Sequence, residues 1–133
     1  MHEESGRRGN GLVLFGHGAR DPEWAGPMRR TREAILAADA SLPVELAFME
    51  FMTPNLDEAV DALVERKLTH ITVIPVFLAQ GGHLKRDVPA LVAAAQARHP
   101  ACEIRLAVAA GESSLVIDAI AAYAMRCSGD DAR

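Results

Sequence analysis

The sequence has few of the residues that crosslink a chain or anchor it in a membrane. Its two cysteines, Cys102 and Cys127, lie 25 positions apart without a CxxC pair, so neither a disulfide framework nor a zinc site is indicated, and both are expected to be reduced. The longest uncharged apolar stretch, Ile71 to Ala79, is far shorter than the ~20 residues of a spanning helix and contains Pro75. The apolar run from Gly11 to Phe15 is too short for the core of a signal peptide. The sequence therefore predicts no membrane association and a cytoplasmic protein.

The sequence also has no excess of positive charge. The formal net charge of -4 argues against nucleic acid as a partner, because binding to phosphates needs a summed positive field. Half of the 133 residues are apolar and 24% are charged, which is typical of one globular domain. Three segments are expected: a polar, disordered leader over 1–10, a single α/β domain over 11–127 and a polar tail over 128–133.

Apolar runs and amphipathic segments alternate along the chain. Short runs rich in β-branched residues predict buried strands, and a spacing of i, i+3, i+4, i+7 predicts helices packed against them. Strands are expected near 11–15, 44–50, 71–78 and 102–108, and helices near 22–39, 56–67, 87–99 and 115–126. The order β-α-β-α-β-α-β-α predicts an α/β fold in which a four-stranded parallel sheet carries helices on both faces.

Single residues refine these boundaries. Asp87 is a suitable N-cap for the third helix, with Pro89 in its first turn. Pro75 predicts a bulge, an edge position or the end of the third strand. Trp24 and Met28 are candidate core contacts of the first helix.

Three chemically capable side chains follow predicted strands. His17 stands in the turn Gly16-His17-Gly18, Glu50 ends the second strand, and His83 follows Gly81-Gly82. Ligands of an open parallel sheet bind at the carboxyl ends of its strands, so these groups are expected at one edge. Imidazole binds Fe, Co and Ni and accepts protons near pH 7, which makes a His2-Glu metal site plausible. Either histidine alone could simply satisfy the backbone of its turn, but the two together favour function.

The remaining histidines carry less weight. His70, at the start of the third strand, is expected at the opposite edge of the sheet, and His99 closes the third helix before Pro100. Both are interpreted as structural or solvated.

Three segments, in order and spacing, resemble a known family: LVLFGHGARDP at 12–22, VELAFMEFMTPNLDEAV at 44–60 and ITVIPVFLAQGGHLKRDVP at 71–89. The chain resembles the class II chelatases of tetrapyrrole biosynthesis, in particular the short, single-domain sirohydrochlorin cobaltochelatases and ferrochelatases. The resemblance implies insertion of Co²⁺, Fe²⁺ or Ni²⁺ into sirohydrochlorin for a cobalamin or siroheme-type cofactor. It also implies that His17 and His83 are the metal-handling pair and that Glu50 is the family's carboxylate.

Further expectations follow from the implied substrate. Sirohydrochlorin carries many carboxylates, so Arg20, Lys85 and Arg86 are candidate binding residues, with Gly81-Gly82 allowing close approach. The metal ion is a substrate, and no organic cofactor is needed. Longer family members carry two such units in one chain, so a homodimer is expected. The sequence departs from the family pattern over 109–114, which puts substrate contacts from that loop in doubt.

Two other functions fit parts of the sequence. A non-catalytic metal chaperone or storage module could use the same two histidines. A flavodoxin-like binder of nucleotides or phosphate could use the glycine turns, but neither GxGxxG nor GxxxxGK[ST] is present.

Overall fold

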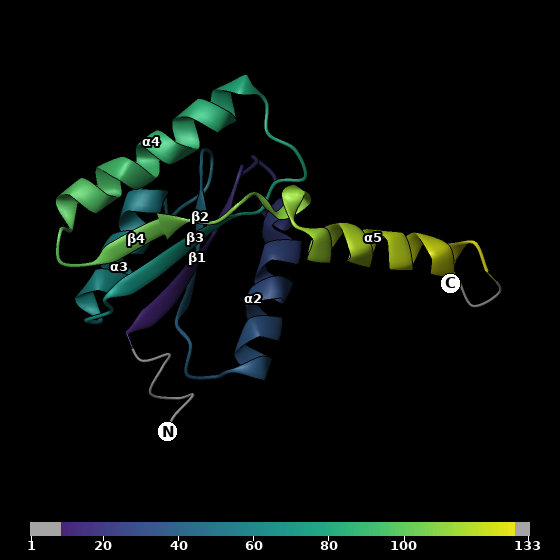
Figure 1. Ribbon diagram of the computed structural model, residues 1–133, viewed down its shortest axis with the longest axis horizontal. Coiled ribbons are helices and arrows are strands. Elements are labelled where there is room, and N and C mark those ends of the chain that lie inside the picture. Colours follow the sequence, from purple (N-terminus) through teal and green to yellow (C-terminus); the bar gives the residue numbers. More distant parts are fainter. Residues whose placement is uncertain (1–8, 130–133) are drawn as a thin grey trace.

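The computed structural model describes residues 9–129, and these form a parallel α/β unit (Figure 1). The strands are β1 (Asn10–Gly16), β2 (Val44–Phe48), β3 (His70–Pro75) and β4 (Glu103–Leu106). The helices are η1 (Pro22–Ala25), α2 (Gly26–Ala38), α3 (Leu56–Glu65), α4 (Gly82–Arg98), η2 (Ala110–Glu112) and α5 (Ser114–Cys127), where η marks a 3-10 helix. The four strands pair in parallel in the order β2-β1-β3-β4, so the predicted fold class is confirmed.

The register brings the carboxyl ends of three strands to one edge of the sheet. Gly16 of β1 pairs with Phe48 of β2, and Phe15 pairs with Pro75 of β3. The third strand thus ends at Pro75, as one of the sequence interpretations allows. The loops that leave these three ends carry His17, Glu50 and the start of α4.

Two apolar layers hold the helices on the sheet. On one face, α3 and α4 pack against alternate residues of the strands, among them Val13, Phe15, Ile71, Val73 and Ile104. On the other face, α2 packs over β1 and β2 in a smaller cluster of Leu14, Ala25, Met28, Val44 and Phe48. The predicted core contact of Met28 is confirmed. Trp24 is 39% exposed, since it lies at the rim of this cluster with its ring edge-on to Phe48.

The start of the helix after β3 differs from the prediction. The helix α4 begins at Gly82, five residues before Asp87, and Pro89 lies inside it. The backbone of Lys85 donates to the carbonyl of Gly81 at 3.1 Å, so a turn has already formed ahead of Pro89. Proline removes only one donor there, and Val88 is fully buried, so packing against the sheet holds the helix together. His83 therefore lies in the first turn of α4 and not in the loop before it.

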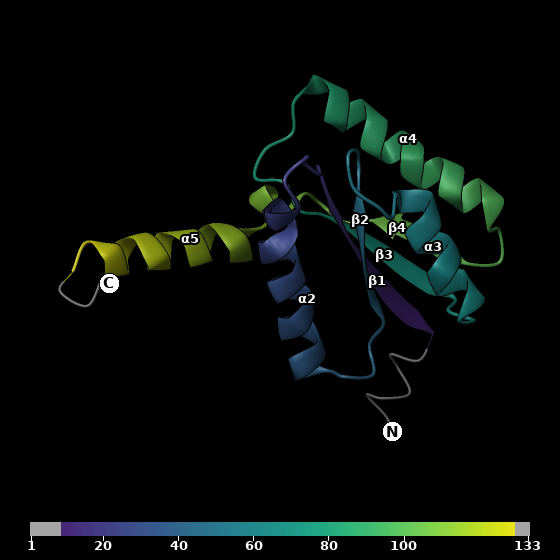
Figure 2. The same cartoon turned by 180° about the vertical axis from the view of Figure 1, so that it is seen from behind.

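The last helix, α5, has no buried residue. In both views of the ribbon it extends away from the sheet and from the other helices (Figures 1 and 2). No helix within residues 9–129 is long and apolar enough to cross a membrane. The predicted leader and tail lie outside the described residues except at 9–10 and 128–129, and β1 already begins at Asn10.

Candidate functional site

The structure pairs two of the predicted site residues. Nε2 of His17 lies 3.2 Å from a carboxylate oxygen of Glu50. Their side chains are 49% and 52% exposed, so the pair faces solvent at the carboxyl edge of the sheet. His17 follows directly after β1, and Glu50 lies two residues beyond the end of β2.

Backbone contacts fix this pair. The amide of Met49 donates to the carbonyl of Gly16 at 2.9 Å, and the amide of Glu50 donates to the carbonyl of His17 at 3.2 Å. Gly18 has φ +92°, and a Cβ placed on it would overlap the carbonyl oxygen of Glu50. Gly18, which the sequence predicted to permit a tight turn, therefore allows the loops after β1 and β2 to contact each other.

An aromatic ring supports the imidazole. The ring of Phe77 meets His17 edge-on, with the centroids 6.4 Å apart. Phe77 is only 7% exposed and also contacts Phe15, so it belongs to the core. It is therefore a core residue that also forms one wall beside His17.

The third predicted residue lies apart from this pair. Nδ1 of His83 is 3.5 Å from a guanidinium nitrogen of Arg86 in the next turn of α4. Because β3 is next to β1, His83 and His17 leave neighbouring strands at the same edge. Within the described part of the chain, no three His, Cys, Asp or Glu side chains are grouped so that they could hold a metal ion. The expected His2-Glu site is thus present as a pair, with His83 outside it.

The predicted cationic residues have different surroundings. The guanidinium of Arg20 stacks over the ring of Phe51, 4.5 Å from its centroid. Phe51 is 56% exposed and follows Glu50 directly, and the sequence interpretation did not single it out. The feature of the sequence that could have identified Phe51 is an aromatic residue directly after the candidate ligand Glu50. Arg86 lies beside His83, while Lys85 makes the first backbone bond of α4.

The two glycines before His83 border open space. A Cβ on Gly81 would meet nothing within 4 Å, and one on Gly82 would meet only the guanidinium of Arg86 at 3.6 Å. Protein packing therefore does not require glycine at these two positions. Both glycines are exposed to solvent.

The atypical loop after β4 closes against the site. The amide of Gly111 donates to the carbonyl of Phe77 at 2.8 Å, and a Cβ on Gly111 would overlap the backbone of Leu78. The loop of residues 109–114 is thus held beside the residues that follow β3. This contact depends on the tertiary structure and could not be read from the sequence.

His70 and His99 lie where the sequence places them. His70 starts β3 at the opposite edge, where its ring contacts Thr69 at 2.9 Å and Glu103 at 3.7 Å. His99 lies 2.7 Å from Asp61, and Arg98 also bonds that carboxylate. The hydrogen bond from His99, and then that from Arg98, lowers the pKa of Asp61 below its usual value. These contacts tie α4 to α3 and are structural.

The fold and the site define a class: a parallel α/β protein with a histidine-carboxylate pair in glycine turns at the carboxyl edge of its sheet. The CbiX family model matches residues 11–126, and the chain belongs to this family. Among solved structures it is similar to a CbiX protein from Marinobacter aquaeolei VT8, with 31% identity, TM-score 0.75 and coverage of 87% of this chain and 94% of that one. It is also similar to the sirohydrochlorin chelatase SirB from Bacillus subtilis subspecies spizizenii, solved in complex with cobalt, with 26% identity and TM-score 0.73, over 87% of this chain and 50% of that one.

Curated relatives named sirohydrochlorin cobaltochelatase match part of the chain. The protein from Priestia megaterium is 39% identical over 66% of this chain and 29% of its own length. The protein from Methanocaldococcus jannaschii is 36% identical over 66% of this chain and 62% of its own length. The match thus spans less than two thirds of either relative.

Proposed function

We propose that this protein is a chelatase that inserts a divalent metal ion, Co²⁺, Fe²⁺ or Ni²⁺, into sirohydrochlorin. The observation that carries the proposal is the pair of His17 and Glu50, held by backbone bonds at the carboxyl edge of the sheet. Membership of the CbiX family and the names of the relatives support the substrate. No organic cofactor enters the reaction, and the metal is consumed as a substrate for a cobalamin or siroheme-type product.

The solvent exposure of His17 and Glu50 suits a metal ion that is bound only until it is transferred to the macrocycle. A structural metal is enclosed by four protein ligands, whereas a pair that is half exposed leaves most coordination positions to water or to the macrocycle. His17 holds the partly dehydrated ion or accepts a pyrrole proton, and Glu50 orients the imidazole and balances charge. His83, in the first turn of the helix α4 that follows the neighbouring strand, is the second imidazole. The two histidines thereby share metal delivery and proton removal.

The tetrapyrrole is proposed to lie over the open space at Gly81-Gly82. Its carboxylates would meet Arg20, Lys85 and Arg86 near the same edge. The ring of Phe51 holds the guanidinium of Arg20 in place, which reduces the freedom that this side chain loses on binding.

Metal insertion followed by absorbance tests the proposal, with sirohydrochlorin and each of the three metals. We expect His17→Ala, Glu50→Gln and His83→Ala each to lower the rate by about 10²-fold or more, the usual contribution of a general base. His70→Ala is the matched control, because His70 lies at the opposite edge, and it should retain activity. Full activity in both single histidine variants would contradict the mechanism. Tight metal binding without any acceleration would instead favour a metal chaperone or store.

A homodimer acting in the cytoplasm completes the proposal. The chain covers 94% of the Marinobacter protein but only 50% of the SirB chain, so a second copy would supply the other half. Cell fractionation tests the cytoplasmic location, and the mass of the protein in solution tests the homodimer.

A further inference from the structure

The backbone of Phe51 adopts a conformation that bulky residues rarely tolerate. Its φ is +70°, in the left-handed region, where the Cβ crowds the following carbonyl oxygen. Lys67 also has a positive φ, but it follows the C-cap of α3, where helices commonly end in this way. Phe51 lies in a loop without such a cap. Strained residues of this kind cluster at functional sites, so the side chain of Phe51 is a candidate for a functional role.

Core packing does not account for the aromatic ring of Phe51. The residue is 56% exposed and belongs to neither of the two apolar layers of the described chain. The loop around it is fixed by other contacts. The amide of Phe48 donates to the carbonyl of Pro54 at 2.9 Å, and Met52 packs against the cluster under α2. The loop would therefore keep its path with a smaller side chain at position 51.

The ring of Phe51 instead contacts the guanidinium of Arg20, which lies 4.5 Å from the ring centroid. The two residues come from the loops after β1 and β2, which are neighbouring strands. Among residues 9–129, no carboxylate pairs with Arg20 and no carbonyl accepts a hydrogen bond from it. A guanidinium over an aromatic face keeps its N–H donors, which lie in its own plane. Arg20 is thus held in place while its donors stay free for a ligand.

We propose that Phe51 is a positioning residue, which holds Arg20 where its guanidinium binds one carboxylate at the rim of the macrocycle. This inference rests on the proposed chelatase function and assigns a subsite to one acidic side chain of the substrate. The guanidinium fork matches a carboxylate because it binds both oxygens at once.

The place of this subsite in the chain links it to the metal-handling pair. Phe51 directly follows Glu50, and Arg20 comes three residues after His17. A fixed guanidinium therefore fixes the macrocycle relative to His17 and Glu50. Phe51 acts through Arg20 and does not touch the reacting atoms, so its loss should weaken binding of the macrocycle and leave the chemical step as it is.

Binding of metal-free sirohydrochlorin tests the inference without metal insertion. Trp24 is the one tryptophan of the chain, and it lies against Gly16, directly before His17, so quenching of its fluorescence reports the bound macrocycle. We expect Phe51→Leu to raise the Kd, and the KM of metal insertion, about 3- to 10-fold with kcat unchanged. Phe51→Tyr keeps the aromatic face and should restore the wild-type Kd.

A second variant separates this role from a structural one. Phe51→Gly also lacks the ring, but glycine suits the positive φ. It should unfold at no lower urea concentration than Phe51→Leu and still bind the macrocycle weakly. Wild-type affinity in Phe51→Gly would overturn the inference.

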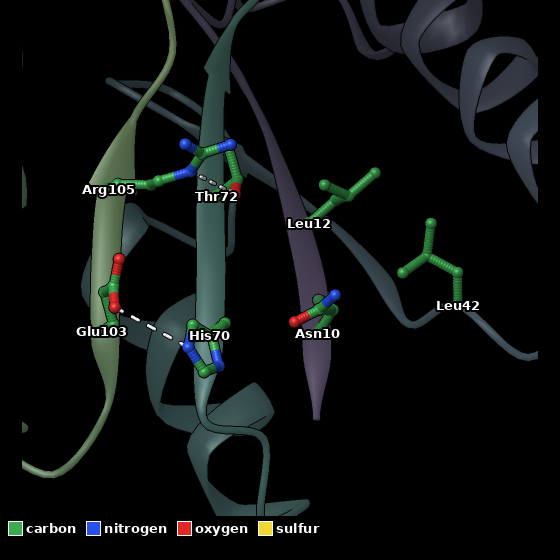
Figure 3. Close-up of a pocket in the computed structure, with 8 residues that line it drawn as sticks. Asn10, Leu12, Leu42, His70, Thr72, Glu103 and Arg105 are labelled. Atoms are coloured by element: carbon green, nitrogen blue, oxygen red, sulfur yellow. Dashed lines mark hydrogen bonds and ion pairs between the residues drawn. The ribbon is translucent and has the colours of Figure 1, made fainter. Parts of the chain in front are cut away.

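Arg105→Leu is the matched control for the loss of a positive charge. Arg105 lies in a groove beside β3 and β4, where it bonds Thr72 at 3.3 Å and His70 lies near Glu103 (Figure 3). This substitution removes the same charge as Arg20→Leu without touching the loops after β1 and β2. It should leave the Kd and kcat at their wild-type values, whereas Arg20→Leu should raise the Kd.

The double variant provides the decisive test. If Phe51 acts only through Arg20, adding Phe51→Leu to Arg20→Leu should raise the Kd no further. A further rise would mean that the ring binds the macrocycle itself, and it would overturn the positioning role. A wild-type Kd in Phe51→Leu would overturn it as well, while the wild-type protein still inserted metal. A wild type that neither binds nor metallates sirohydrochlorin would overturn the proposed function and this inference together.

Discussion

Gly18→Ala should separate the two loops that carry the candidate site. The native φ of +92° lies where residues with a Cβ are strained, at a cost of about 1–3 kcal/mol. The new methyl group would also overlap the carbonyl oxygen of Glu50, and such crowding costs a further 1–3 kcal/mol or so. The expected loss of about 2–6 kcal/mol is large beside a total stability of roughly 5–15 kcal/mol.

The substitution should also affect function through geometry. The peptide of Glu50 must move by about 1 Å to accept the methyl group, which disrupts the 3.2 Å contact with His17. A displacement of this size is expected to lower the rate of metal insertion by about 10²-fold. Neither histidine nor carboxylate is removed, so the loss would come from their positions alone.

Urea unfolding followed by circular dichroism measures the first effect, and the insertion assay measures the second. We expect the unfolding midpoint to fall by at least about 1 M for a typical urea dependence. Gly26→Ala is the matched control, because a Cβ there would meet only the flexible end of Arg30, at 3.4 Å, in the first turn of α2. If Gly18→Ala matched Gly26→Ala in both stability and rate, the argument that the glycine holds the loops together would be refuted.

Two further predictions concern groups away from the site. Asp61→Asn should lower the stability by at most about 1 kcal/mol near neutral pH, because Asp61 accepts from His99 and Arg98 at the surface. Since the folded pKa of Asp61 is lowered, this contribution is complete above about pH 4 and is lost as the pH falls through the folded pKa, so thermal melts of the two proteins should converge in acid. Burial raises the pKa of the Cys102 thiol, so it should react with a thiol reagent only after unfolding.

Local patterns accounted for most of the secondary structure. The apolar runs predicted all four strands, because buried parallel strands need apolar residues on both faces. The capping box of Asn55 and Glu58 marks the start of α3, which the sequence placed near Leu56. The predicted start of α4 was wrong by five residues. A favourable N-cap such as Asp87 does not prevent a helix from beginning earlier when packing supports the earlier turn.

The sequence by itself determined the fold class and which side chains leave the strands at one edge. Both follow from short-range rules: strand and helix periods, and the parallel order that right-handed crossovers impose. Only the tertiary structure decided that His17 pairs with Glu50 while His83 lies apart beside Arg86. It likewise left all residues of α5 unburied within the part of the chain that the structure describes. Such distances depend on where separate loops end in space, and a pattern of residues along one chain does not contain that information.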